Sequence, residues 1–352
     1  MITTSTDTEC AQILFANAGK AEQQDRLAAE SVEALRQSGA FALRTPVAHG
    51  GAWASATTIT GRLADLGRAC PSAAWVAGTC LTAKSLVVGN YAGQVPDEAF
   101  ADPDALACGS GVPAAHGVRV AGGVRITGRW PNVSGCEDAA WAGLALTVDG
   151  KMCWAFIPVG DLTVERTWQM AGMRGTGSHT LVADEVLVPA RWVAPGAMHG
   201  PAARILFSIA VLAPVVGAAY GALDVINAMF ASDRKPFMTS YSRMGESPGA
   251  RQWLAEATHL VARAERAMLA VAEASERGDL SDPDVVRLSM DMADAARDCR
   301  AAAERMLDLH GASGFAAANP LQRYWRDISV ASRHPHLNPY LAVERLGAAL
   351  VP

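Results

Sequence analysis

Residues 118–135 read VRVAGGVRITGRWPNVSG, and this stretch decides the fold class. β-Branched residues alternate with small and charged ones on both sides of Gly122-Gly123, which predicts two strands joined by a tight turn. The same texture returns at 140–159 and at 179–189. We therefore expect residues 105–199 to form a compact antiparallel β domain, either a barrel or a sandwich.

Helical patterns flank this β region on both sides. Before it, residues 21–39 end in a glycine that suits a helix C-terminus, and residues 71–89 begin with a proline that suits a first turn. After it, apolar residues recur at spacings of three and four along two long stretches. We expect a mixed α and β fold, with a helical N-terminal domain at 1–104 and a helical bundle at 200–352.

Composition limits the classes of function. Of 352 residues 18% are charged, the net charge is −5, and no cluster of Lys and Arg is visible. We therefore expect no nucleic-acid partner and no membrane partner, and the low charged fraction indicates an oligomer interface. The apolar run at 205–226 is interrupted by Ser208 and Pro214, so it predicts a buried helix rather than a membrane span.

Cysteines and isolated histidines give no metal site. The seven cysteines are scattered without a CxxC pair, which predicts free thiols in a reducing, cytoplasmic compartment. No basic region precedes an apolar core at the N-terminus, so no secretory signal is expected. His116, His179 and His199 lack partners at ligand spacing and are interpreted as structural or exposed.

Two glycine-containing segments could hold a planar ring. In GRWPNVSG (128–135) an aromatic residue precedes a small hydroxyl and a glycine, so a ring could lie against the backbone while Ser134 donates to it. In WQMAGMRGTGS (168–178) the backbone amides near Gly175 and Gly177 could cradle a phosphate or a ring edge. The alternatives are a strand end followed by a turn, and a plain loop.

A third segment, HGASGFAAANPLQRYWRDISVASRHPHLNP (310–339), indicates a helix that breaks at its glycines and resumes near Leu321. Arg326 and Asp327 are interpreted as a buried ion pair. His334 is a candidate proton shuttle, because histidine titrates near neutral pH. The alternative for His334 and its neighbour His336 is an ordinary exposed pair.

Four segments, in order, carry a resemblance to a known family. They are ESVEALRQSGAFALRTPVAHGG (30–51), GVRITGRWPNVSGCEDAAW (123–141), MAGMRGTGSHTLVADEVLVP (170–189) and NPLQRYWRDISVASRHPHLNP (319–339). The chain resembles flavin-dependent monooxygenases of the acyl-CoA dehydrogenase fold over nearly its whole length. The resemblance implies a helical N-terminal domain, a central β domain and a C-terminal four-helix bundle, assembled as a homotetramer or homodimer.

The resemblance also implies a cofactor and its site. The cofactor would be reduced flavin, FMN or FAD, which reacts with O2 to give a C4a-hydroperoxyflavin that oxygenates a small apolar or aromatic biosynthetic intermediate. A separate flavin reductase would supply the reducing equivalents, since no nicotinamide motif is visible. Ser134 and His334 would be catalytic. The cofactor-binding residues would be Trp130, Val133, Ser134, Gly135, Arg174, Gly175, Thr176, Gly177 and Arg326.

At two places the sequence differs from that of the flavin-dependent monooxygenases, and these differences leave other functions possible. Acyl-thioester dehydrogenases and oxidases with FAD carry a catalytic glutamate in a segment that here reads SRHPHLNP, with no carboxylate before Glu344. Glu246 or Glu256 could replace it from an earlier helix. Many hydroxylases of this branch carry a second histidine where this chain has Ala83. A non-oxidative scaffold is therefore a third interpretation.

Overall fold

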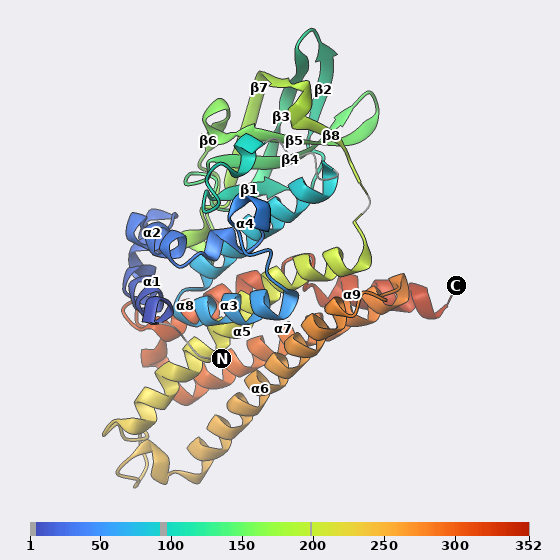
Figure 1. Ribbon diagram of the computed structural model, residues 1–352. Helices are drawn as coiled ribbons and strands as arrows, with labels where there is room; N and C mark the ends of the chain where they lie inside the picture. Colours follow the sequence, from blue (N-terminus) through green and yellow to red (C-terminus); the bar gives the residue numbers. More distant parts are fainter. Residues whose placement is uncertain (1–4, 92–96, 198, 352) are drawn as a thin grey trace. The chain divides into compact units, whose positions relative to one another are not determined.

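The computed structural model describes residues 5–91, 97–197 and 199–351, and its elements follow the expected order of helices, strands and helices (Figure 1). The α-helices are α1 (Ser5–Gln24), α2 (Ala29–Gln37), α3 (Ala56–Ala69), α4 (Pro71–Asn90), α5 (Pro201–Ala231), α6 (Pro248–Glu276), α7 (Asp282–His310), α8 (Pro320–Ala331) and α9 (Pro339–Leu350). The strands are β1 (Ala107–Ser110), β2 (Ala115–Val120), β3 (Gly123–Val133), β4 (Trp141–Val148), β5 (Lys151–Pro158), β6 (Thr163–Glu165), β7 (His179–Pro189) and β8 (Val193–Pro195). The mixed α and β class is confirmed.

The strands form one sheet in the order β6-β7-β3-β2-β4-β5-β8, with β1 beside β4. The pairing is mostly antiparallel, but β4 is parallel to both β1 and β2. The expected antiparallel β domain is confirmed in its main pairing, and the parallel pairs arise because residues 134–140 carry the chain past β2 to its other side. Among the described residues the pairing ends at β6 and β8 and does not close into a ring.

The expected turn between β2 and β3 is present. Val120 pairs with Gly123, which leaves Ala121 and Gly122 as a two-residue loop, and Gly122 adopts a φ of 90°. A second two-residue loop, Asp149-Gly150, joins β4 to β5 with positive φ at both positions. Such tight loops fix the register of the strands that they join.

The described chain divides into two compact units, and both are discontinuous in sequence. The first contains Met1–Ser55, Ser72–Met170 and Arg174–Gly200. The second contains Ala56–Pro71, Ala171–Met173 and Pro201–Pro352. The sheet begins at Ala107 and α5 begins at Pro201, and α3 belongs to the same compact unit as the C-terminal helices.

Close packing explains why α3 belongs to the second unit. A Cβ added at Gly217 of α5 would lie 2.1 Å from the carbonyl oxygen of Ala64, and one added at Gly67 would lie 2.7 Å from that of Pro214. Glycines at these positions let the α3 and α5 backbones approach closely. α3, α5, α6 and α7 together form a bundle, so one of its four long helices comes from the N-terminal half.

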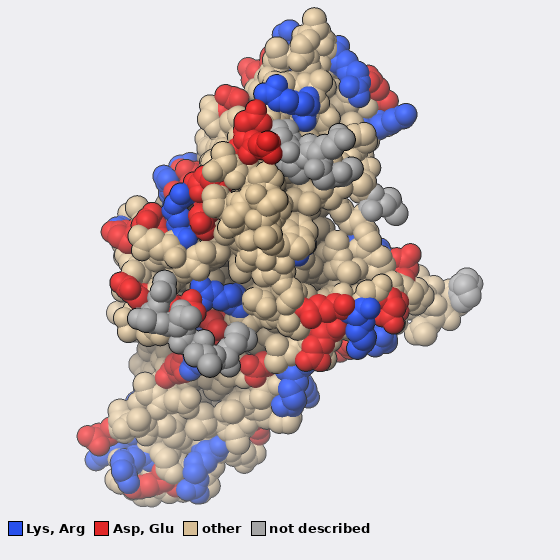
Figure 2. Space-filling model, in the orientation of Figure 1, with Lys and Arg blue, Asp and Glu red and all other residues tan. Residues whose placement is uncertain are grey.

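α5 is the apolar core of the bundle. It is long and apolar enough to cross a membrane by composition, but 89% of its most apolar window is buried inside the protein. The expectation of a buried helix at 205–226 is confirmed. On the face shown in Figure 2, basic and acidic side chains are interspersed. Among the described residues, Arg68 pairs with Asp224 and Arg36 pairs with Asp102.

Candidate functional site

A buried chain of hydroxyl groups follows the end of β3, in the first unit. The indole N–H of Trp75 donates to Ser134 Oγ at 3.2 Å, and the Ser134 and Ser178 hydroxyls lie 2.7 Å apart. Ser178 Oγ lies 2.7 Å from Thr176 Oγ1. All three hydroxyl residues are 6% exposed or less. The two glycine-containing segments of the sequence therefore meet through this chain.

The direction of these hydrogen bonds determines what Ser134 can do. Three hydroxyls carry three hydrogens, and the two bonds between them use two. When Thr176 donates to Ser178 and Ser178 donates to Ser134, the Ser134 oxygen accepts twice and its own hydrogen points outside the chain. That hydrogen suits an acceptor such as a ring nitrogen or carbonyl.

Two glycines let the loops approach. Gly135 has a φ of 73°, its N–H donates to the Thr176 carbonyl at 2.8 Å, and an added Cβ would lie 2.9 Å from Val76. Gly177 has a φ of 50°, and an added Cβ would lie 3.0 Å from the Asp25 carbonyl oxygen. Both positions therefore disfavour a side chain.

The resemblance places Trp130 and Val133 beside the flavin ring. Both are 0% exposed within the sheet core, and the Trp130 indole N–H donates to the Ala145 carbonyl at 2.7 Å. Neither residue offers surface to a planar ligand in this structure. Trp130 follows Val124 and Ile126 on the buried face of β3. A register shift after Trp130, with Asn132 at a φ of 59°, accompanies the inward position of Val133.

Arg174 and Gly175 open the glycine-rich loop as part of a short 3-10 turn, Arg174–Thr176. Arg174 Nε donates to Asp25 Oδ1 at 2.7 Å, and this bond raises the pKa of the guanidinium. An added Cβ at Gly175 would lie 3.0 Å from Ala21. The first part of the loop is thus held against the α1–α2 region of the same unit.

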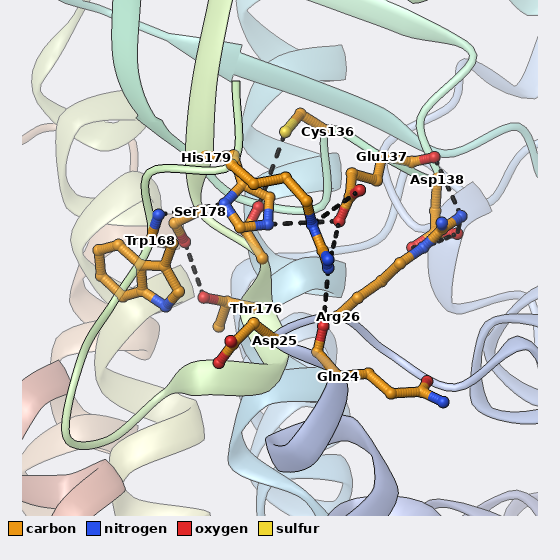
Figure 3. Close-up of polar contacts among 12 residues, drawn as sticks. Gln24, Asp25, Arg26, Cys136, Glu137, Asp138, Trp168, Thr176, Ser178 and His179 are labelled. Carbon is orange, nitrogen blue, oxygen red and sulfur yellow. Dashed lines mark hydrogen bonds and ion pairs between the residues drawn. The ribbon is translucent and has the colours of Figure 1, made fainter. Parts of the chain in front are cut away.

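A polar network that the sequence did not reveal adjoins this loop (Figure 3). His179 follows Ser178 directly and is 1% exposed. Its Nδ1 accepts the backbone N–H of Trp168 at 3.1 Å, so the neutral ring carries its proton on Nε2, which lies 3.3 Å from a Glu137 carboxylate oxygen. Burial lowers the pKa of His179, and the negative charge of Glu137 raises it by a smaller amount.

The same network connects residues 136–138 with the end of α1 and the segment that follows it. Arg166 contacts Glu137 and donates to the Gln24 carbonyl at 2.7 Å, while Arg26 forms a two-point ion pair with Asp138 (Figure 3). Only spatial proximity identifies this cluster, because its members are far apart in sequence. His179 was interpreted as structural or exposed, and the structure shows that it is buried.

Arg326 and Asp327 lie on α8 in the second unit. The Asp327 carboxylate accepts the backbone N–H of Met173, and Arg326 donates to the Ala171 carbonyl and to Gln322 Oε1. An added Cβ at Gly172 would lie 2.3 Å from the Arg326 carbonyl oxygen. Both residues therefore fix the segment Ala171–Met173 against α8.

His334 follows the end of α8 in the second unit. Its ring stacks on His336 with centroids 5.2 Å apart and planes 19° apart. Its Nδ1 accepts the backbone N–H of His336 at 3.3 Å. Burial, and then the neighbouring His336, lowers the pKa of His334 to about 4, although part of the residue reaches solvent. His334 is therefore neutral at pH 7.

The two glutamates considered for α-proton removal have other partners. Glu246 accepts hydrogen bonds from the backbone and hydroxyl of Ser242, which lower its pKa. Glu256 pairs with Arg305 at 3.1 Å. A general base at neutral pH needs a raised carboxyl pKa, so neither arrangement favours an acyl-thioester dehydrogenase.

Ala83 is buried on α4, and the polar group beside it has a structural role. Lys84 is 2% exposed and donates to the Phe41 carbonyl, to Thr45 Oγ1 and to the Pro103 carbonyl at 2.7–2.9 Å. Burial is the largest cause that lowers the pKa of this amine. Its three hydrogen bonds use the three donors of an ammonium.

Comparison with known proteins identifies the family. The chain is 31% identical to the oxygenase component of FADH2-dependent resorcinol hydroxylase from Rhizobium sp. (strain MTP-10005), over 93% of this chain and 88% of that protein. The chain belongs to the flavin-dependent monooxygenases with the acyl-CoA dehydrogenase fold. Residues 209–339 also match the family described as acyl-CoA dehydrogenase, C-terminal domain.

Solved structures agree with this assignment. XiaF from Streptomyces sp., in complex with FADH2 and glycerol, superposes with a TM-score of 0.88 at 29% identity, over 98% of this chain and 93% of that one. The 3-HSA hydroxylase from Rhodococcus sp. RHA1 gives 0.85 at 26% identity, over 99% and 97%. The protein is thus a monooxygenase whose cofactor is reduced flavin.

The residues of the first unit fit such a cofactor in part. The Ser134 hydroxyl is a suitable donor to a flavin ring edge when Ser178 donates to Ser134. Trp130 and Val133 have no exposed surface to offer. Within the first unit, the fit therefore rests on Ser134 and the adjoining loop Arg174–Ser178.

Proposed function

We propose that this monooxygenase hydroxylates a small aromatic biosynthetic intermediate. The relatives support an aromatic substrate, since they include a resorcinol hydroxylase and a p-hydroxyphenylacetate 3-hydroxylase. The structural observation that supports this function is the buried chain of hydrogen bonds from Trp75 through Ser134 and Ser178 to Thr176. When Thr176 donates to Ser178 and Ser178 donates to Ser134, this chain leaves the Ser134 hydrogen for a flavin acceptor.

Each site residue has a proposed role. Bound reduced flavin would supply electrons that activate O2, and O2 would supply the oxygen atom. Ser134 donates a hydrogen bond at the ring edge, and the backbone at Gly135 and along the loop from Arg174 to Gly177 holds the ring system. Arg326 positions the segment Ala171–Met173, which precedes that loop. His334, neutral at pH 7, exchanges a proton with the substrate or with the oxygen being transferred.

The proposed partners follow from the same assignment. The names of two relatives refer to an oxygenase component, which supports a separate flavin reductase as partner. FADH2 in the names of a relative and of a solved structure favours FAD over FMN. We place the enzyme in the cytoplasm as a homodimer or homotetramer.

Anaerobic stopped-flow mixing tests this function. Protein loaded with chemically reduced FAD or FMN is mixed with oxygenated buffer, and flavin absorbance is followed with and without resorcinol. We expect a long-lived transient before the oxidised spectrum forms, and a shorter transient in Ser134→Ala. Binding of reduced flavin, measured without oxygen, gives a second readout.

Two results would count against the proposal. Immediate reoxidation to H2O2 with no transient, in wild-type protein that binds reduced flavin, would overturn the oxygenase role of the hydroxyl chain. An unchanged transient in Ser134→Ala would remove Ser134 from the site.

A further inference from the structure

His179 joins the two segments that form the buried hydroxyl chain. Its backbone pairs with Val133, the residue before Ser134, and its N–H donates to the Gly177 carbonyl at 2.7 Å. Its ring packs directly on the glycine-rich loop, since a Cβ added at Gly177 would lie 3.7 Å from His179 Nε2. His179 therefore contacts the segment of Ser134 and the segment of Ser178 at the same time.

The ring of His179 also holds the start of that loop. Its Nδ1 accepts the backbone N–H of Trp168 at 3.1 Å (Figure 3). Its Nε2 makes no aligned hydrogen bond with any described residue and lies 3.3 Å from a Glu137 oxygen, so the ring holds the loop through Nδ1. A neutral imidazole has one acceptor nitrogen, and an imidazolium has none. Protonation of the ring would therefore release the Trp168 N–H.

The surroundings of His179 favour its neutral form. The titratable and charged groups that face it are Glu137, Arg166, Asp25 and Cys136. Arg166 pairs with the Glu137 carboxylate at 3.2 Å, and burial keeps the Cys136 thiol neutral by raising its pKa to about 12. Burial is the largest effect on the pKa of His179 and lowers it, Arg166 also lowers it, and Glu137 and Asp25 raise it by less in total. The ring is thus neutral near pH 7 and gains its proton only in acid.

We propose that His179 is a positioning residue for the hydroxyl chain at the flavin site, and that it holds the loop 168–178 in place only while its ring is neutral. This inference rests on the proposed function, which assigns Ser134 to the flavin ring edge.

Acid would act on the site through one hydrogen bond. The ring gains a proton from water at Nδ1, the Trp168 N–H loses its acceptor, and the start of the loop is released. Ser178 belongs to the same loop and directly precedes His179, so its hydroxyl would no longer hold Ser134 in one orientation. The affinity for reduced flavin should therefore fall as pH drops through the folded pKa of His179, and it should be constant at higher pH.

Anaerobic titration with reduced FAD between pH 5 and pH 8 tests this role. We expect the affinity of wild-type protein to fall by about 10-fold from about pH 6.5 toward pH 5, the size expected for the loss of one hydrogen bond. His179→Asn keeps an oxygen acceptor near the position of Nδ1 and cannot titrate, so it should lack this acid loss. Other groups that titrate in this range are the same in both proteins, and the difference between the two profiles therefore belongs to His179.

Two further variants separate positioning from packing. His179→Phe keeps an aromatic ring but offers no acceptor, so we expect it to bind reduced FAD about 10-fold more weakly at every pH. Glu137→Gln removes a negative charge that raises the pKa of His179, so the acid loss should begin at a lower pH. His116→Asn, at an exposed position on β2 of the same unit, is the control and should keep the wild-type profile. A role in packing alone would reverse the order, with His179→Phe near wild type and His179→Asn weaker.

Two measurements on the protein without flavin test the contact itself. In hydrogen–deuterium exchange at pH 7.5, peptides that cover residues 166–173 should exchange faster in His179→Phe than in wild type, and at the wild-type rate in His179→Asn. Nitrogen-15 NMR of histidine-labelled full-length protein should show His179 with a protonated Nε2 and a bare Nδ1 at this pH. Its signals are assigned by their loss in His179→Asn.

The failure of this inference and that of the proposed function are distinguishable. If wild type and His179→Asn bound reduced FAD with the same pH profile, the inference would be overturned and the proposed function would stand. A protonated Nδ1 in wild-type protein at pH 7.5 would overturn it as well, whatever the variants do. If wild-type protein bound neither reduced FAD nor reduced FMN at any pH, the proposed function would fail, and the inference would fail with it.

Discussion

Ser178 is the residue on which the buried hydroxyl chain depends, since it contacts both Ser134 and Thr176. Ser178→Ala would leave two buried hydroxyls without this partner. An unsatisfied buried polar group costs about 1–3 kcal/mol, so we expect the free energy of unfolding to fall by about 2 kcal/mol. Because the orientation of Ser134 would also relax, the affinity for reduced flavin should fall. Urea denaturation and anaerobic flavin titration measure the two effects.

Ser289→Ala is the matched control for that prediction. Its hydroxyl donates to a carbonyl one turn earlier in α7, and its loss should change stability by less than about 0.5 kcal/mol. If Ser178→Ala destabilised the protein no more than this control, the hydroxyl chain would have no energetic role.

His334 should make stability depend on pH. A histidine in an unfolded chain has a pKa of about 6.5, whereas the folded value is about 4. Between these values only the unfolded chain binds the proton, so the free energy of unfolding falls as pH drops from 6.5 toward 4 and is constant above that window. The full effect is up to about 3 kcal/mol, reduced by solvent screening.

Urea denaturation at pH 7.5 and pH 5 measures this dependence. His334→Gln should flatten the loss of stability, and His259→Gln, at an exposed position on α6, should not. The lowered pKa of His336 acts in the same direction, so the double variant should be flatter still. An equal pH dependence in wild type and His334→Gln would show that the folded His334 titrates normally.

Single residues were predicted from the sequence with mixed success. Ser134 and the glycine-rich loop lie side by side. Both segments could be located in the sequence because strand and turn signals mark their ends. Trp130 was placed at the ligand because aromatic residues suit flat rings, yet it lies on the buried face of β3 with Val124 and Ile126. The partners Trp75, His179 and Glu137 depend on tertiary contacts that no local pattern contains.

At the level of elements, the packing of α3 on α5 depends on Gly217. A methyl group there would lie 2.1 Å from the Ala64 carbonyl oxygen, so Gly217→Ala must push the two helices apart. We expect a loss of about 1–3 kcal/mol or more, although alanine favours helix. Thermal unfolding measures the loss.

Gly347→Ala gives the opposite result with the same chemical change. Gly347 lies in α9, is exposed, and has no atom within 4 Å of an added Cβ. Helix propensity alone then acts, and stability should rise by about 0.5–1 kcal/mol. If both variants lowered stability equally, close packing at Gly217 would not be the cause.

The elements themselves were largely predictable, because periodicity and turn residues are local signals. The start of α4 at Pro71, the turn at Gly122, and the end of α7 before Gly311 all match their sequence patterns. The parallel pairing of β4 and the grouping of α3 with the C-terminal helices were not predicted. Both result from long-range contacts between segments whose own patterns do not specify a partner.

For the whole molecule, we expect an exposed apolar face on α9 to take part in the proposed self-association. Tyr340, Val343 and Leu350 of α9, with Val351 directly after it, are 55–80% exposed and recur at helical spacing. A contiguous apolar helix face is costly in water and usually marks an interface. The low charged fraction of the chain, 18%, is consistent with a second copy of the chain as the occupant.

The double variant Val343→Glu, Leu350→Glu tests assembly through α9. Two carboxylates in an apolar interface would each lose hydration without a partner, so we expect dissociation to a smaller species of similar secondary structure. Sedimentation velocity and circular dichroism measure these properties. Val112→Glu is the control, because Val112 is 62% exposed in the first unit and lies outside α9. A double variant with the mass of wild-type protein would show that α9 does not hold the copies together, whatever the oligomeric state.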